Sequence, residues 1–149
     1  MAKKRKNKTF EQICSELKND SSDLPSLADL RINPPTNYPL FGFKYLKDTT
    51  HKHCNNGVFF VKFLERLNKL SSLGWKEIEK DDRHSFGTEK IDIEQLYPEV
   101  DLPPQFKKYD KLTVFRATGD NHVFAGIREH NTFHIFFIES EFGKLYDHD

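Results

Sequence analysis

Apolar side chains in the middle of the chain follow a helical spacing. Residues 58–70 place a row of them on one helical face, namely Phe60, Phe63, Leu64, Leu67 and Leu70. A second, shorter helix follows over residues 73–80, where Trp75 and Ile78 point inward and Ser72 is the candidate N-cap. The pattern predicts two consecutive helices, a helical hairpin.

The spacing changes to alternation in the last third of the chain, which is typical of β-strands. Three such runs cover residues 111–117, 122–128 and 132–140, and short turns join them. In the last run both sets of alternating positions are mostly apolar, so we expect this strand to be covered on both faces of its sheet. Residues 40–47 (LFGFKYLK) alternate in the same way and predict a further strand before the helices.

The order strand, helical hairpin and antiparallel β-meander predicts an α+β fold. The helices are expected to pack on the sheet and to bury Leu64, Leu67 and Trp75 against the last strand. Replacing a buried leucine of this face by alanine would leave a cavity and destabilise the domain.

Two segments lie outside this pattern. Residues 92–106 contain three prolines and predict a long irregular connection. Residues 1–39 predict an N-terminal extension ahead of a folded domain at 40–149. Within it we expect residues 1–8 to be disordered and residues 9–19 to form a short amphipathic helix.

Composition and charge indicate a single folded domain with a basic N-terminal run. The chain has 149 residues, enough for one domain, and its 14 Phe and 5 Tyr supply a core although only 36% of the residues are hydrophobic. Lys and Arg total 23, as do Asp and Glu, so the net charge is zero; residues 1–8 hold five cations and no acid, which leaves −5 on the rest. The basic run is interpreted either as a solvated tail or as a phosphate-binding arm.

The sequence predicts neither a membrane protein nor a metalloprotein. No apolar run is long enough to cross a membrane, and no apolar stretch follows the basic start as a signal peptide requires. Cys14 and Cys54 cannot build a disulfide framework, so we expect a cytoplasmic protein. His51, His53 and Cys54 lie close together, but zinc prefers four ligands and a second pair is missing. Both a polar loop and a metal site fit this segment; we expect no metal and no cofactor.

Side chains that exchange protons or stabilise negative charge gather toward the C-terminal end. Acid–base chemistry without a metal needs a group that titrates near neutral pH and a cation. The predicted strands and the residues after them hold Arg116, His122, Arg128, His130, His134, Tyr146 and His148. Each histidine taken alone also fits a structural role, and Arg116 also fits a cross-strand ion pair.

Two further basic segments are candidates for phosphate contacts. Residues 106–116 carry four cations against one acidic residue, a local charge of +3. The second segment follows the second helix, where a cation at the helix C-terminus is the alternative role. The candidates in these segments are Arg83, His84, Lys107, Lys108 and Lys111.

Two stretches of the chain resemble the RelE/ParE-like toxin superfamily of bacterial toxin–antitoxin systems. The stretch from FVKFLERL to FGTEKI (60–91) is similar to the family's helical hairpin and the turn after it. The stretch from LTVFRATGD to FGKLY (112–146) is similar to its strand pair around a Gly-Asp turn and its closing strand. Arg116 ahead of the Gly119-Asp120 turn is the best single match, and the resemblance covers about residues 40–148.

The resemblance implies an endoribonuclease that cleaves mRNA, usually on the ribosome, by attack of a 2′-hydroxyl group. Arg116 and Arg128 would stabilise the phosphorane, and His122 or His148 with Tyr146 would transfer protons. The partners implied are RNA or the ribosome and an antitoxin protein. The RNA-binding residues implied are Arg83, His84, Lys107, Lys108 and Lys111.

The chain departs from the family in features that argue against ribosome binding, and a second hypothesis stands beside the first. The N-terminal extension, the insertion at 92–106 and the acidic balance after residue 8 are unusual for its ribonucleases. The alternative is a non-catalytic module of the same fold that binds a protein partner through an aromatic-rich face, because a fold by itself does not fix a function. An enzyme requires the basic and histidine side chains to converge in one place, whereas a binding module does not.

Overall fold

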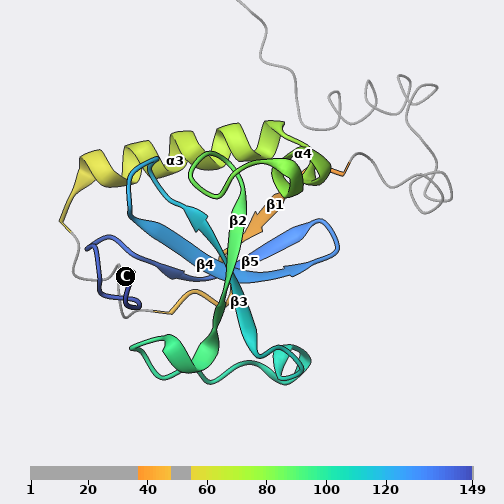
Figure 1. Cartoon of the computed structure of the whole chain (residues 1–149), viewed down its shortest axis with the longest axis vertical. Coiled ribbons are helices and arrows are strands. Elements are labelled where there is room, and N and C mark those ends of the chain that lie inside the picture. Colours follow the sequence, from red (N-terminus) through yellow and green to blue (C-terminus); the bar gives the residue numbers. More distant parts are fainter. Residues whose placement is uncertain (1–36, 48–54, 149) are drawn as a thin grey trace, which may run out of the picture. The chain divides into compact units, whose positions relative to one another are not determined.

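The computed structural model describes residues 37–47 and 55–148, which form a five-stranded sheet with two helices (Figure 1). The segment predicted as a helix at 9–19 and the possible metal ligands His51, His53 and Cys54 lie outside the described residues. The elements run in the order β1 (Leu40–Gly42), α3 (Gly57–Ser72), α4 (Trp75–Lys80), β2 (Thr88–Asp92), β3 (Lys111–Arg116), β4 (Val123–Glu129) and β5 (Thr132–Ile138).

The sheet has the strand order β1-β5-β4-β3-β2. Strands β2 to β5 pair antiparallel with their sequence neighbours, whereas β1 pairs with β5 in parallel, Leu40 opposite Thr132. The α+β prediction is confirmed, and the predicted antiparallel meander is present as β3 to β5, but the parallel strand β1 makes the sheet as a whole mixed. Alternation of apolar residues indicates a strand without indicating its direction, and the long helical connection after β1 permits a parallel pairing.

The two edge strands, β1 and β2, both differ from the prediction: β1 is shorter than predicted, and β2 was not predicted. The strand expected over residues 40–47 pairs only as far as Gly42, because a turn follows in which Leu46 N–H donates to the Phe43 carbonyl. The strand β2, with the sequence TEKID, was not predicted. Only Ile91 of its five residues is buried, so an apolar alternation is missing.

Helix α3 begins where the Asn56 side chain accepts a hydrogen bond from Phe59 N–H. Its buried residues are Phe59, Phe63, Leu67 and Leu70. The prediction that Leu64 is buried is wrong, since its exposed fraction is 68%. Each residue turns the helix by about 100°. The side chain of Leu64, which directly follows Phe63, therefore points away from the buried face on which Phe63 lies.

Helix α4 is shorter than predicted and is not capped by Ser72. The Ser72 hydroxyl donates to the Lys69 carbonyl within α3, and Gly74 occupies the N-cap of α4 without a side-chain bond. The predicted inward residues Trp75 and Ile78 are both buried. The hairpin therefore packs on the sheet as expected, with only Leu73 and Gly74 between its helices.

Both faces of the sheet are covered. The helices pack on one face against Phe115, Phe124 and Phe133, whose rings contact one another with centroids 5.0–5.8 Å apart. The connection between β2 and β3 and the C-terminal segment cover the other face. That connection is irregular, as predicted, and contains two short 3₁₀ turns, Ile93–Gln95 and Pro104–Phe106. Strand β5 is accordingly buried on both sides, which confirms its prediction.

Candidate functional site

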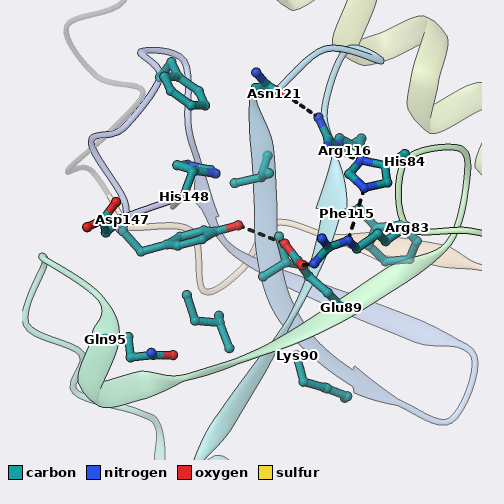
Figure 2. A pocket seen from close by; sticks show the side chains of 15 residues that line it. Arg83, His84, Glu89, Lys90, Gln95, Phe115, Arg116, Asn121, Asp147 and His148 are labelled. Atoms are coloured by element: carbon teal, nitrogen blue, oxygen red, sulfur yellow. Dashed lines mark hydrogen bonds and ion pairs between the residues drawn. The ribbon is translucent and has the colours of Figure 1, made fainter.

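A pocket of about 560 Å³ lies at the β2 edge of the sheet (Figure 2). Its walls come from the turn after α4, from β2 and β3, from the turn between β3 and β4, and from the C-terminal segment. It brings together five of the ten site residues that the family resemblance implies, namely Arg83, His84, Arg116, Tyr146 and His148.

Arg116 is the last residue of β3, and the turn that follows fixes its guanidinium. Gly119 adopts φ +86°, which a residue with a side chain rarely adopts, and so allows the chain to reverse there. Arg116 Nη1 donates to the Asp120 carbonyl at 2.6 Å and to Asn121 Oδ1 at 2.8 Å. Both acceptors are uncharged groups, and no carboxylate of the described residues forms an ion pair with Arg116. Its positive charge is thus available to an anion.

His84 lies between two arginines. Arg116 Nη2 is 2.6 Å from its Nδ1 and Arg83 Nε is 3.3 Å from its Nε2. A neutral imidazole has one acceptor nitrogen, so the two guanidinium groups compete for it. The cluster therefore has more donors than acceptors, which suits an anion with several oxygens such as a phosphate group.

A third guanidinium, that of Arg66 on α3, adds positive charge beside this cluster. It lies over the Phe86 ring, 4.1 Å from the centroid, and donates to the Ser85 carbonyl. Burial first, and the charge of Arg116 second, lower the pKa of Arg66, which the nearby Asp81 partly offsets. The repulsion between Arg66 and Arg116 is a cost that a bound anion would relieve.

Glu89 on β2 connects the arginines to the aromatic side of the pocket. Its carboxylate accepts from Arg83 Nη1 at 2.8 Å and from Tyr146 Oη at 3.1 Å. Burial of the phenol, followed by the negative charge of Glu89, raises the pKa of Tyr146 far above its usual value. Tyr146 therefore keeps its proton and acts as a hydrogen-bond donor, not as a base.

The His148 ring is held between two aromatic rings on the C-terminal segment. Its centroid lies 4.1 Å from that of Tyr146 and 4.6 Å from that of Phe142, each pair with an interplanar angle of 28°. His148 Nε2 lies 2.9 Å from Oε1 of Glu139, a carboxylate that is fully buried. The pocket thus contains an imidazole whose orientation is fixed on three sides.

His122 does not line the pocket. It follows the same turn as Asn121, but its Nδ1 contacts Asp120 Oδ1 at 2.7 Å and its ring faces Phe59 on α3. Burial opposes ionisation of Asp120, but hydrogen bonds from Thr118 and from the backbone and ring of His122 outweigh it and lower the pKa of Asp120 to about 2. The geometry gives His122 a role in holding the turn.

Arg128 also lies apart from the pocket. Its guanidinium covers the Trp75 ring at 4.0 Å, and its Nη1 donates to Glu79 Oε1 at 2.6 Å. Both partners belong to α4, so Arg128 fastens that helix to β4. Of the other histidines, His134 Nε2 lies 3.6 Å from Glu129, and His130 is in the turn between β4 and β5 with φ 56°.

The lysines proposed to bind RNA lie at the other end of β3. Lys111 begins that strand and Arg116 ends it, so their Cα atoms are about 17 Å apart. Lys111 forms an ion pair with Asp92 at 3.0 Å, and Lys108 Nζ lies 5.3 Å from the Tyr109 ring. Lys107 lines a separate pocket whose charged side chains are mostly acidic. The structure does not bring these lysines to the arginine pocket.

Sequence reasoning missed several residues of the site. Asn121 and Phe142 line the pocket, Glu89 joins its two sides, and Glu139 holds His148. For Glu139 the sequence contains a signal, because a single acidic residue directly ends the apolar run FHIFFI of β5. Such a residue is buried only when a partner satisfies it. Its partner, nine positions further on, is not evident from spacing.

In residues 37–47 and 55–148, no group of three or more His, Cys, Asp and Glu side chains is placed to hold a metal ion. None of the helices in these same residues is both long enough and apolar enough to cross a membrane.

Comparison with known proteins finds no match to this chain among protein-family models, curated proteins or solved structures.

Proposed function

We propose that this protein is an endoribonuclease that cleaves RNA by acid–base catalysis without a metal ion. The observation that carries the proposal is the convergence of Arg83, Arg116 and His148 in one pocket. Cations for a phosphate group and an oriented imidazole are the two requirements of this chemistry. They come from three separate parts of the chain: the turn after α4, the end of β3 and the C-terminal segment.

The proposed reaction begins when His148 takes the proton of a ribose 2′-hydroxyl group. The 2′ oxygen attacks the adjacent phosphorus, the bond from phosphorus to the 5′ oxygen breaks, and the leaving oxygen takes a proton from water. The products are a 2′,3′-cyclic phosphate and a 5′-hydroxyl group. Arg116 and Arg83 donate to the nonbridging oxygens, whose negative charge grows in the transition state.

The proposal extends to the RelE/ParE-like superfamily. The element order that the resemblance implies is a strand, a helical hairpin and a meander, which is the order of β1, α3, α4 and β2 to β5. Arg116, the best match to the family, is the arginine of the pocket that has no carboxylate partner among the described residues. On this reading the protein is a cytoplasmic toxin that acts on free or ribosome-bound RNA and is neutralised by an antitoxin.

One observation favours the alternative, a non-catalytic module that binds a protein. The outer face of α3 carries a row of apolar side chains, Val58, Val61 and Leu64, with exposed fractions of 66%, 60% and 68%. Contiguous exposed apolar residues are a feature of protein–protein contacts. This row lies on the face of α3 opposite the sheet, so both functions are compatible with one chain.

The test is cleavage of RNA by the purified protein in the presence of a metal chelator. The expected result is fragments that end in a 2′,3′-cyclic phosphate, from naked RNA or from RNA on ribosomes. The matched control is an oligonucleotide with a 2′-deoxy sugar at the cleaved position, which lacks the attacking group and must stay intact. If the protein cleaves no RNA under either condition, the binding module becomes the better account.

A further inference from the structure

Glu139 is the one carboxylate in the described residues whose side chain is wholly buried. It directly follows β5. Its Oε2 takes part in hydrogen bonds, whereas its buried Oε1 has no hydrogen-bond partner in the described residues. Oε2 accepts a hydrogen bond from Leu145 N–H at 3.0 Å and lies 3.0 Å from His148 Nε2, and Oε1 lies 2.9 Å from the same nitrogen. A buried carboxylate is costly without partners, so the fold retains it together with His148.

The geometry around His148 leaves it one orientation. The Tyr146 and Phe142 rings stack on its two faces, and Glu139 holds one edge of the ring. Its side chain has an exposed fraction of 16%. The ring lines the pocket. Because Nε2 contacts Glu139, the ring nitrogen that remains to exchange a proton with a molecule bound in the pocket is Nδ1.

We propose that Glu139 is a positioning residue that keeps the His148 proton on Nε2 and so makes Nδ1 the base of the site. This inference rests on the proposed function, to which it adds the proton-accepting atom. A carboxylate accepts hydrogen bonds and cannot donate one. The proton between Glu139 and His148 therefore stays on Nε2 whether the imidazole is neutral or protonated.

The carboxylate has a second effect during the reaction. When Nδ1 takes the proton of the 2′-hydroxyl group, the ring becomes positively charged, and the negative charge of Glu139 stabilises it at 2.9 Å. Glu139 itself gains no proton in this step. A carboxylate behind a histidine has this role in proteins that use such pairs, where the wrong tautomer costs as much as about 10⁴-fold in rate.

The variant that isolates this effect is Glu139→Gln. A glutamine retains the size of the side chain, and its carbonyl oxygen accepts from Leu145 N–H as Oε2 does. Its amide nitrogen then takes the place of Oε1, 2.9 Å from His148 Nε2. An amide nitrogen donates hydrogen bonds and does not accept them, so the tautomer with the proton on Nδ1 gains relative to the wild-type protein. The matched control is Glu141→Gln, two positions further along, because the Glu141 side chain has an exposed fraction of 64% and its only described partner is Lys144.

The first measurement is nitrogen NMR of the full chain labelled at histidine, with the His148 signals assigned by their loss in His148→Ala. Protonated and unprotonated ring nitrogens give separate signals. We expect a protonated Nε2 in the wild-type protein and in Glu141→Gln, and a protonated Nδ1 in Glu139→Gln. A protonated Nδ1 with a bare Nε2 in the wild-type protein overturns the proposal even if Glu139→Gln fails to fold.

The second measurement is the rate of RNA cleavage by the same proteins. We expect Glu139→Gln to lose about 10²- to 10⁴-fold in rate while Glu141→Gln cleaves like the wild type. If the tautomers are as expected and no protein cleaves RNA, the proposed function fails and the assignment of the Nε2 proton stands. If Glu139→Gln has the altered tautomer and cleaves at the wild-type rate, Glu139 is not a positioning residue.

Discussion

Arg116 Nη2 lies 2.6 Å from Nδ1 of His84, although the two residues are 32 positions apart in the chain. The contact joins the end of β3 to the turn after α4, so two distant segments meet only in the folded sheet. Arg83 lies on the other side of the same imidazole. The cluster of Arg83, His84 and Arg116 therefore has more hydrogen-bond donors than acceptors.

The packing of α3 is tested by two leucines of the same helix. Leu67 is buried between the helix and the sheet, and Leu64 points outward with an exposed fraction of 68%. We expect Leu67→Ala to lower the free energy of unfolding by about 2–5 kcal/mol and Leu64→Ala to change it by less than about 0.5 kcal/mol. Urea denaturation of both variants measures this. Equal losses would mean that α3 presents a different face to the sheet.

Arg128 is expected to matter for stability and not for cleavage. Its guanidinium covers Trp75 at 4.0 Å and contacts Glu79 on α4. We expect Arg128→Ala to lower the free energy of unfolding by about 1–2 kcal/mol and to leave the rate of RNA cleavage unchanged when the protein is folded. A folded variant that has lost cleavage would return Arg128 to the catalytic residues, as the sequence suggested.

The turn after β3 is expected to weaken in acid. Hydrogen bonds lower the folded-state pKa of Asp120 to about 2, from an ordinary value of 3.8. A lowered carboxyl pKa stabilises the folded state above the unfolded pKa, and this contribution is lost as the pH falls from 3.8 toward 2. The stability difference between the wild type and Asp120→Asn should therefore shrink over this interval.

Carbon NMR of the Asp120 carboxyl group gives its pKa directly. Urea denaturation of the wild type and Asp120→Asn at several acidic pH values gives the stability difference. A difference that stays constant from neutral pH to pH 2 would show that the turn does not hold the ionised carboxylate as described.

The helices and strands were easier to predict from the sequence than the contacts between them. The helices and the strands β3, β4 and β5 were predicted because regular apolar spacing is local information. Strand β2 was not, since its place at the sheet edge leaves it mostly polar.

The sequence predicted which types of residue the site contains better than it predicted which of them lie together. Arg116 and His148 were suggested by their chemistry, yet Lys111 was suggested for the same reason and lies at the opposite end of β3. Which cations converge depends on strand pairing and on the path of the C-terminal segment. Neither leaves a periodic signal, and the pairing of Glu139 with His148 is an example.

Growth of bacteria gives a cellular prediction. If the pocket degrades RNA in cells, induced expression of the wild-type chain slows growth, and Arg116→Ala relieves the effect at equal protein abundance. Immunoblots supply the abundance, and Lys111→Ala, a lysine paired with Asp92 away from the pocket, is the control that should remain as inhibitory as the wild type. Relief by both variants at equal abundance would mean that growth inhibition does not depend on this pocket.

The rate of RNA cleavage by wild type, Arg116→Ala and Lys111→Ala, measured with purified proteins under single-turnover conditions, tests the central claim most directly. Loss of one positioned donor to a developing negative charge typically costs about 10²- to 10³-fold in rate. We predict that loss for Arg116→Ala, an unchanged rate for Lys111→Ala, and the same thermal unfolding temperature for Arg116→Ala as for the wild type within a few degrees. Equal cleavage rates for Arg116→Ala and the wild type, or no cleavage of any RNA by the wild type, would contradict the claim that this pocket cleaves RNA.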